Sequence, residues 1–339
     1  MAHRPLTLDE ILSFKANGYV IVRGFFPTDT VNRWRRQVWA ATTVNANDWP
    51  DGDFAGTYTG TVRSSGQRNT ALFTPEARKR LVYPFPGEDT VADPFPIEPA
   101  IIDEPNARAA LNQLLGEGTY GSGIGAPGDA GAGVENDVVV CNWPGKADAR
   151  STVPYHKPHV EGMRPDRKGG CVCRWFVGMT TYLDDVSPGG GATYVWPKSH
   201  LAVHRYFQNW PRHLPSGGAI NDKLDVGSVD GVPTCGPRGG MTADYMHSAL
   251  PGSYDSAPHE AVMQKGDVLI WHHWCVHASS TNYSDRVRQA IITRFHTTRW
   301  GHEQMTDAGG VATNKDLWKY WADDVRNAGA PRLRVPPKL

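Results

Sequence analysis

The chain has 339 residues, of which 40% are hydrophobic and 21% are charged, and its 35 basic side chains balance its 35 acidic ones. A formal net charge of zero argues against nucleic acid or an anionic membrane surface as a partner, because both attract a basic excess. The sequence has no apolar run that could span a bilayer and no signal-peptide pattern, so we expect a cytoplasmic protein. Its five cysteines, an odd number, are then expected to be reduced.

The first predicted elements lie within the N-terminal forty residues. Thr7 and Glu10 have the spacing of a capping box and Asn17-Gly18 is a stop signal, which predicts a helix between them. Residues 19–23 read as a strand, and a second helix is expected to begin near Thr28 with an apolar stripe. Its stripe consists of Val31, Trp34 and Val38. Beyond it, the polar and proline-rich residues up to 100 predict loops, and a short helix follows at 107–115.

Strand signals dominate from residue 136 onward, where many of the 36 glycines and 26 prolines separate short β-prone runs. We predict one domain over 1–339, of mainly β class, with a sandwich or barrel core and flanking helices. Helices and loops occupy 1–135, the core occupies 136–297 with a polar insertion at 208–258, and a final helix occupies 313–328. The expected core strands are 138–141, 171–183, 192–196, 267–276 and 287–296.

A metal-binding pattern begins at His159-Val160-Glu161. On a strand, positions i and i+2 share a face, so this pair places one imidazole beside one carboxylate. Two histidines and one carboxylate suit non-haem Fe(II), because three coordination positions stay open. The run from Gly266 to His277 offers a second histidine, and alternation along it puts His273 and His277 on one face. Two arginines in the next strand, Arg286 and Arg288, have the planar group that binds a carboxylate at two points.

Taken in order, these motifs resemble the phytanoyl-CoA dioxygenase (PhyH-like) family of Fe(II)/2-oxoglutarate-dependent oxygenases. The matching features are an early His-x-carboxylate, a proline corner and a distal histidine followed by Asn, Ser and Arg, and residues 14–24 match the usual start. The sequence has Glu161 where aspartate is commoner and Lys198 where glycine is usual. The resemblance covers residues 7–40 and 137–297, and it implies a double-stranded β-helix, that is, a jelly-roll or cupin-like core. The residues concerned are His159-Val160-Glu161, Pro197-Lys198-Ser199-His200, His277, Asn282, Ser284 and Arg288.

The resemblance also implies the role of each site residue. Fe(II), 2-oxoglutarate as co-substrate and O2 are the expected cofactors. Arg288 is expected to bind the distal carboxylate of 2-oxoglutarate, with Ser279 adding a hydrogen bond at that end and Thr180 contacting the same co-substrate. A carboxylate in the ligand set disfavours halogenation. The iron ligands and catalytic centre are expected to be His159, Glu161 and His277.

Several neighbouring residues compete for these roles. His156 is interpreted as lining the pocket, His200 as a structural cap, and His273 as lying deeper in the barrel than His277. Arg286 stays a rival to Arg288, since alternation puts both on one face. Further along that strand, Arg294 and His296 have two open interpretations, as substrate-pocket lining or as packing residues.

The expected activity is oxidation of an unactivated C–H bond in a small molecule of secondary metabolism, with release of succinate and CO2. Hydroxylation is the default outcome, and desaturation, cyclisation or epimerisation are alternatives. The rival class is a non-catalytic metal- or ligand-binding β-barrel. A zinc hydrolase is disfavoured because the sequence has no HExxH motif. The sequence indicates neither the substrate nor the oligomeric state.

Overall fold

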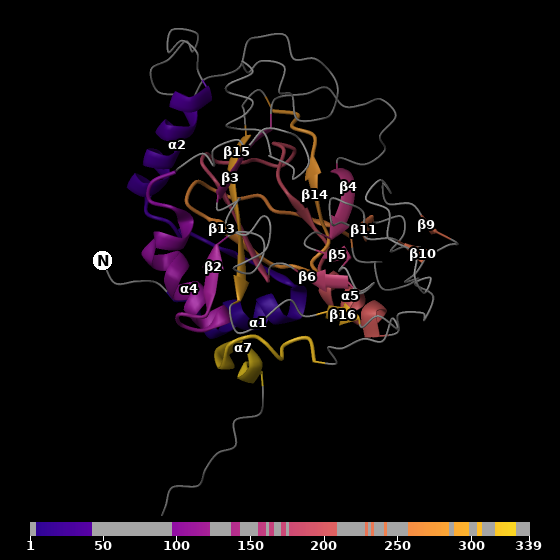
Figure 1. Ribbon diagram of the computed structural model, residues 1–339. Helices are drawn as coiled ribbons and strands as arrows, with labels where there is room; N and C mark the ends of the chain where they lie inside the picture. The colour runs from indigo at the N-terminus through magenta and orange to yellow at the C-terminus, as the bar shows by residue number, and fades with distance from the viewer. Residues whose placement is uncertain are drawn as a thin grey trace, which may run out of the picture.

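A computed structural model describes residues 5–42, 97–122, 137–142, 155–160, 163–165, 171–173, 176–208, 228–229, 232–233, 241–242, 257–284, 288–297, 304–306 and 316–329. Within these ranges the chain forms mainly antiparallel sheets with a few helices (Figure 1), which confirms the mainly β class. No helix in the described part of the chain is long and apolar enough to cross a membrane.

The largest sheet, here the main sheet, has the strand order β1-β13-β7-β15-β2, and β3 also pairs with β15. All of its pairings are antiparallel. Every position of β7 is buried, because both faces of the sheet are covered. The strands are β1 (Tyr19–Val22), β2 (Tyr120–Ser122), β3 (Asp137–Asn142), β7 (Val177–Tyr182), β13 (Val268–His272) and β15 (Arg288–Thr297).

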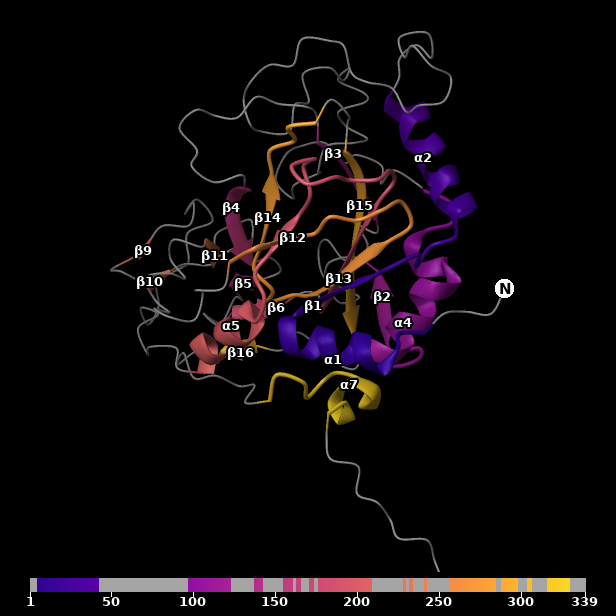
Figure 2. The same cartoon turned by 180° about the vertical axis from the view of Figure 1, so that it is seen from behind.

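Helices cover one face of the main sheet. Ile270 and Phe295 of the sheet pack against Phe14, Trp34 and Leu111 of the helices in one buried cluster, the helix-side core. The capping box at the start of the first helix forms as predicted, and the second helix buries its predicted stripe. In Figures 1 and 2, α1 and α7 lie side by side at one end of the sheet. The helical elements on this side are α1 (Leu8–Asn17), α2 (Thr28–Thr42), η3 (Ile101–Asp103), α4 (Pro105–Leu115) and α7 (Asp323–Asn327).

A second sheet lies on the side of β13 and β15 away from α4 (Figure 2), with the strand order β11-β4-β14-β8-β12. Leu269 and Trp271 of the main sheet pack with Val195 and Ala261 of the second-sheet region in the inter-sheet core. Its strands are β4 (Tyr155–Val160), β8 (Tyr194–Val195), β11 (Met241–Thr242), β12 (His259–Glu260) and β14 (His277–Ser280). The remaining elements are α5 (Ser199–Gln208), the pair β9 (Ser228–Val229) and β10 (Val232–Pro233), and a small sheet of β5 (Met163–Pro165), β6 (Cys171–Cys173) and β16 (Gln304–Thr306).

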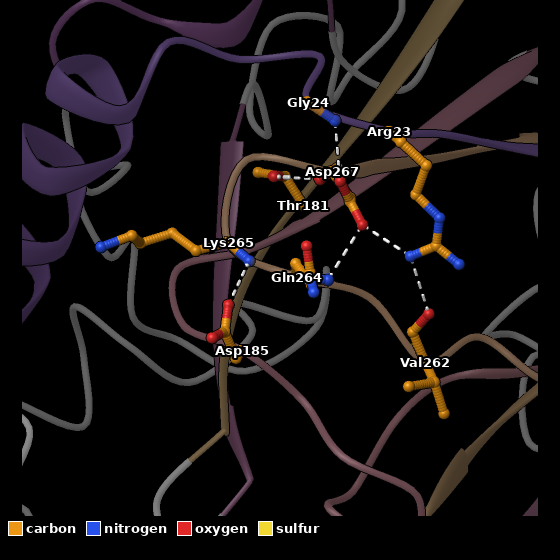
Figure 3. A network of polar contacts seen from close by, with 8 residues as sticks. All are labelled: Arg23, Gly24, Thr181, Asp185, Val262, Gln264, Lys265 and Asp267. Carbon is orange, nitrogen blue, oxygen red and sulfur yellow. Dashed lines mark hydrogen bonds and ion pairs between the residues drawn. The ribbon is translucent and has the colours of Figure 1, made fainter.

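Asp267, at the start of β13, ties that strand to the end of β1 (Figure 3). Its carboxylate accepts hydrogen bonds from the backbone N–H groups of Gly24 at 2.8 Å and Gln264 at 2.9 Å, and forms an ion pair with Arg23 at 2.6 Å. Its carbonyl accepts from the Thr181 hydroxyl at 2.8 Å. Because the side chain is buried, these partners replace the water that the carboxylate loses, and they fix the edge of the main sheet.

Three predicted elements differ from the structure. The single strand expected at 171–183 is two strands, β6 and β7, in different sheets. The strand expected at 267–276 ends at His272, because the chain turns there and crosses to the second sheet as β14. In the described part of the helix expected at 313–328, residues 317–320 form a turn and the helix begins only at Asp323.

Candidate metal centre

Strand pairing places two of the predicted ligand positions together. β4 and β14 are antiparallel neighbours, and His277 lies directly opposite His159 in their register. Directly opposite positions share a face of a sheet, and their Cβ atoms are typically about 5 Å apart. Two residues that are remote in sequence therefore occupy adjacent positions on one face, which is the spacing that two ligands of a single metal ion require.

The His277 ring is oriented by its own strand. Its Nδ1 atom lies 3.0 Å from the carbonyl oxygen of Cys275. Because a carbonyl oxygen only accepts, Nδ1 is the donor, and the neutral ring in this tautomer carries its lone pair on Nε2. Metal-binding histidines usually donate their second ring nitrogen to such an acceptor, which fixes both tautomer and ring orientation. His277 is buried, at 8% exposure, and therefore fits the role of an Nε2 metal ligand.

Two other predicted site residues fall partly or wholly outside the described residues. Glu161 follows the last residue of β4 and is not described. Ser279 is described as part of the β14 backbone, where it lies opposite His156 after a register shift that follows His277. One residue of β14 lies between these two pairs but two residues of β4 do, so the extra residue belongs to β4, between His156 and His159.

Arg288 begins β15 and is buried, at 5% exposure. Its Nε atom donates to the Gly191 carbonyl at 2.8 Å, and its guanidinium carbon lies 5.5 Å from the centre of the Tyr182 ring. Tyr182 belongs to the inter-sheet core, so Arg288 lies on the sheet face that looks toward the second sheet. Its rival Arg286 lies outside the described residues. The hydrogen bond from Nε restrains the orientation of the guanidinium plane, and two-point binding of a carboxylate requires such a fixed plane.

Thr180 and Trp271 also lie between the two sheets. The Thr180 hydroxyl, on β7, accepts a hydrogen bond from the indole N–H of Trp271 at 3.2 Å, and both residues are buried. The Trp271 and His277 ring centroids are 4.3 Å apart, with the ring planes inclined by 49°. The sequence does not single out this tryptophan, because one of 12 tryptophans in an apolar strand carries no signal that separates it from an ordinary core residue.

Two residues further along β15 have different surroundings. Arg294 is buried and lies opposite Gly178, which lies opposite Trp271, so it occupies the same cross-strand row. His296 lies opposite Gly121 of β2, where an added Cβ would lie only 2.8 Å from the imidazole. The close packing of the His296 ring on Gly121 favours a packing role for His296.

The interpretation of His273 as lying deeper in the same barrel face as His277 is wrong. β13 ends one residue earlier, so the alternation that linked the two histidines does not extend across the turn. His273 instead contacts the carbonyl of Phe176 at 3.2 Å, and its ring stacks on His272 with centroids 4.2 Å apart. His272 in turn stacks on Trp321, which belongs to the helix-side core.

His200 has the structural role expected of it. It lies in α5, directly after the proline corner, and its Nε2 atom donates to the carbonyl oxygen of Lys15 at 3.0 Å, within the last turn of α1. It thereby satisfies one of the carbonyl groups that a helix C-terminus leaves without an intrahelical partner.

Comparison with known proteins gives one family match. The family model "Phytanoyl-CoA dioxygenase (PhyH)" matches residues 156–290. This segment contains all six predicted site residues: His159, Glu161, Thr180, His277, Ser279 and Arg288. No curated protein matches the chain.

Solved structures with a related arrangement include the non-heme alpha-ketoglutarate-dependent carbocyclase SnoK from nogalamycin biosynthesis, at 13% identity and a TM-score of 0.44, covering 94% of this chain and 98% of that one. HygX from Streptomyces hygroscopicus is 12% identical in its apo form, with a TM-score of 0.43 and coverage of 89% and 90%. With nickel and 2-oxoglutarate bound it is 11% identical, with a TM-score of 0.42 and coverage of 89% and 91%. These scores are too low to carry a functional assignment. The sequence match is the finding that bears on the family: residues 156–290 match the phytanoyl-CoA dioxygenase (PhyH) family model, the family that the order of the motifs predicts.

Proposed function

We propose that the protein is an Fe(II)/2-oxoglutarate-dependent dioxygenase that oxidises a C–H bond of a small molecule. The observation that carries this proposal is the register of β4 and β14, which sets His159 opposite His277 inside the segment that matches the family. A purely structural histidine has no need of a second histidine at the paired position.

In this proposal His159, Glu161 and His277 bind the iron. The Cys275 carbonyl keeps the His277 lone pair on Nε2, which supports this role. The two facing sheets would correspond to a jelly-roll core over 136–297, with the insertion at 208–258, in a single domain.

Arg288 binds the distal carboxylate of 2-oxoglutarate, and Ser279 and Thr180 assist at the co-substrate. The burial of Arg288 strengthens this interaction, because an ion pair shielded from water is weakened less by solvent. The Thr180 hydroxyl accepts one hydrogen bond from Trp271 and still has a proton to donate.

When bound, Fe(II) and 2-oxoglutarate would activate O2, which is the oxidant, and the co-substrate would leave as succinate and CO2. The chain contributes placement: the paired histidine positions hold the metal between the sheets, and the inter-sheet core keeps water away from the site. Hydroxylation is the proposed default outcome, on a small-molecule substrate of secondary metabolism.

The test is anaerobic titration of the purified protein with Fe(II), then with 2-oxoglutarate. His277→Ala should weaken Fe(II) binding by more than about 100-fold, since even residues outside the ligand shell cost about 10- to 100-fold. Arg288→Lys should leave Fe(II) binding unchanged and weaken 2-oxoglutarate binding by about 10- to 100-fold, the value of a charge-assisted, two-point contact.

Arg294→Lys is the matched control, since Arg294 is also buried on the same strand and the same sheet face. It should leave 2-oxoglutarate affinity close to that of the wild type. Equal losses in both arginine variants, or wild-type Fe(II) affinity in His277→Ala, would contradict the proposal. The rival function, a non-catalytic binder, predicts metal and co-substrate binding without O2-dependent formation of succinate.

A further inference from the structure

We propose that Trp271 is a positioning residue for His277, and that Thr180 and Gly178 hold its indole in place for that purpose. The inference rests on the proposed function, because it takes His277 to be an iron ligand. It assigns a specific task to a tryptophan and a glycine that the sequence motifs do not include.

The backbone creates a place for the indole on the inner face of the main sheet. Trp271 on β13 lies opposite Gly178 on β7. A Cβ added at Gly178 would overlap the six-membered ring of the indole, so the ring packs against a position that only glycine leaves open. Any larger residue there would push the indole toward the second sheet, and therefore toward His277.

A hydrogen bond then sets the direction of the indole. Its N–H, which can only donate, points at the Thr180 hydroxyl at 3.2 Å, two residues further along β7 on the same face. The close contact with Gly178 fixes the position of the ring, and the bond to Thr180 fixes the direction of its N–H. The bond also satisfies a donor that burial removes from water, so its loss would leave the indole N–H unpaired at this site.

His277 is the residue against which this fixed indole packs. The two ring centroids are 4.3 Å apart, although the residues come from different sheets. The imidazole thus has two restraints: Nδ1 donates to the Cys275 carbonyl, and the ring packs against the indole. A histidine side chain has two rotatable bonds, so these two contacts together define the direction of Nε2. A metal ligand fixed before the ion arrives loses less side-chain entropy on binding.

The test measures binding of Co(II) alone, in the absence of 2-oxoglutarate, by its visible absorption spectrum. Trp271→Phe keeps an aromatic ring but removes the indole N–H. It should weaken Co(II) binding by about 10-fold, the lower end of the effect of residues that orient a ligand, and should alter the Co(II) band pattern. Trp321→Phe is the matched control, since Trp321 is equally buried but belongs to the helix-side core. It should lower the melting temperature without changing Co(II) affinity or spectrum.

Variants of Thr180 test the relay even if Trp271→Phe fails to fold. Thr180→Val removes the hydroxyl at constant shape and should weaken Co(II) binding several-fold, whereas Thr180→Ser should restore wild-type binding. In the double variant, Thr180→Val should add little to Trp271→Phe, because Thr180 acts through the indole.

Two results would overturn this inference without touching the proposed function. One is a folded Trp271→Phe variant with the Co(II) affinity and spectrum of the wild type. The other is a Thr180→Val effect that adds fully to the effect of Trp271→Phe. The two proposals are distinguished by His277→Ala. If that variant binds Co(II) as the wild type does, the proposed function fails as well.

Discussion

Acidification should destabilise the protein through three buried histidines, His200, His272 and His273. Burial lowers the pKa of His200 to about 4 and that of His273 to about 3, and it lowers the pKa of His272 well below its ordinary value. His200 and His272 stand 5.4 Å apart by ring centroid, and His200 Nδ1 and His272 Nε2 are buried without a hydrogen-bond partner among the described residues. Protonation of His200 would place the new proton on Nδ1, which has no described acceptor, and protonation of His272 would place it on Nδ1, which already accepts the Trp274 N–H at 3.0 Å.

The sign follows from which state binds more protons. In the unfolded chain each imidazole takes up its proton near pH 6.5, whereas in the folded chain it stays neutral to a lower pH. The unfolded state is therefore favoured as the pH falls below 6.5, and the effect saturates only below the folded pKa values. Between pH 7.5 and 5.5 each of the three histidines should lower the free energy of unfolding by about 1.4 kcal/mol, which amounts to about 4 kcal/mol for the three together.

Urea denaturation at pH 7.5, 6.5 and 5.5 measures this loss. His273→Asn retains a donor for the Phe176 carbonyl but cannot titrate, so it should reduce the fall in unfolding free energy by about 1.4 kcal/mol. His200→Gln, which can still reach the Lys15 carbonyl, should do the same. The control His259→Gln changes an exposed side chain and should have a smaller effect. A fall of the same size in His273→Asn and in the wild type would refute the reasoning.

Three further predictions concern stability. Gly18→Ala should lower the free energy of unfolding by about 2 kcal/mol, because Gly18 has φ +81° and an added Cβ would overlap the His200 ring. Gly24→Ala should lower it by only about 1 kcal/mol, because Gly24 has φ +56° but open space around it. Equal losses in urea denaturation would contradict this prediction. Asp267→Asn should cost about 2 kcal/mol and lower the melting temperature, because the amide group cannot accept at both of its atoms; an unchanged melting temperature would count against the network. Fe(II) at 100 times its dissociation constant should stabilise the wild type by about 2.7 kcal/mol and should stabilise His277→Ala far less. Differential scanning fluorimetry with and without a chelator measures this difference. Equal shifts of the melting temperature in both proteins would indicate that Fe(II) binds elsewhere.

Local signals in the sequence predicted the elements whose causes are local. The capping box of Thr7 and Glu10 and the αL glycine at position 18 define α1 within ten residues, and the structure has the same boundaries. The strand at 19–23 and the helix beginning near Thr28 were likewise predicted from periodicity and turn residues. These patterns depend only on neighbours in the chain, so a single sequence contains them.

Features that depend on distant pairing were not predictable in the same way. The run 171–183 contains one charged residue, Arg174, which does not by itself end a strand, yet the two parts of the run pair with different strands, β6 with β5 and β16, and β7 with β13 and β15. The histidine run was misinterpreted for the same reason, since nothing local shows that the chain leaves the main sheet after His272. The register that sets His277 opposite His159 is also non-local, and only the resemblance to a family indicated that these two residues belong together.

The most direct test of the central claim is the position of the metal. Crystals grown anaerobically with Fe(II) and 2-oxoglutarate should show one anomalous peak at the iron absorption edge. This peak is expected within about 2.1 Å of one ring nitrogen from each of His159 and His277, the usual length of a metal–imidazole bond. An iron peak bonded to only one of these two histidines, or lying elsewhere in the molecule, would contradict it.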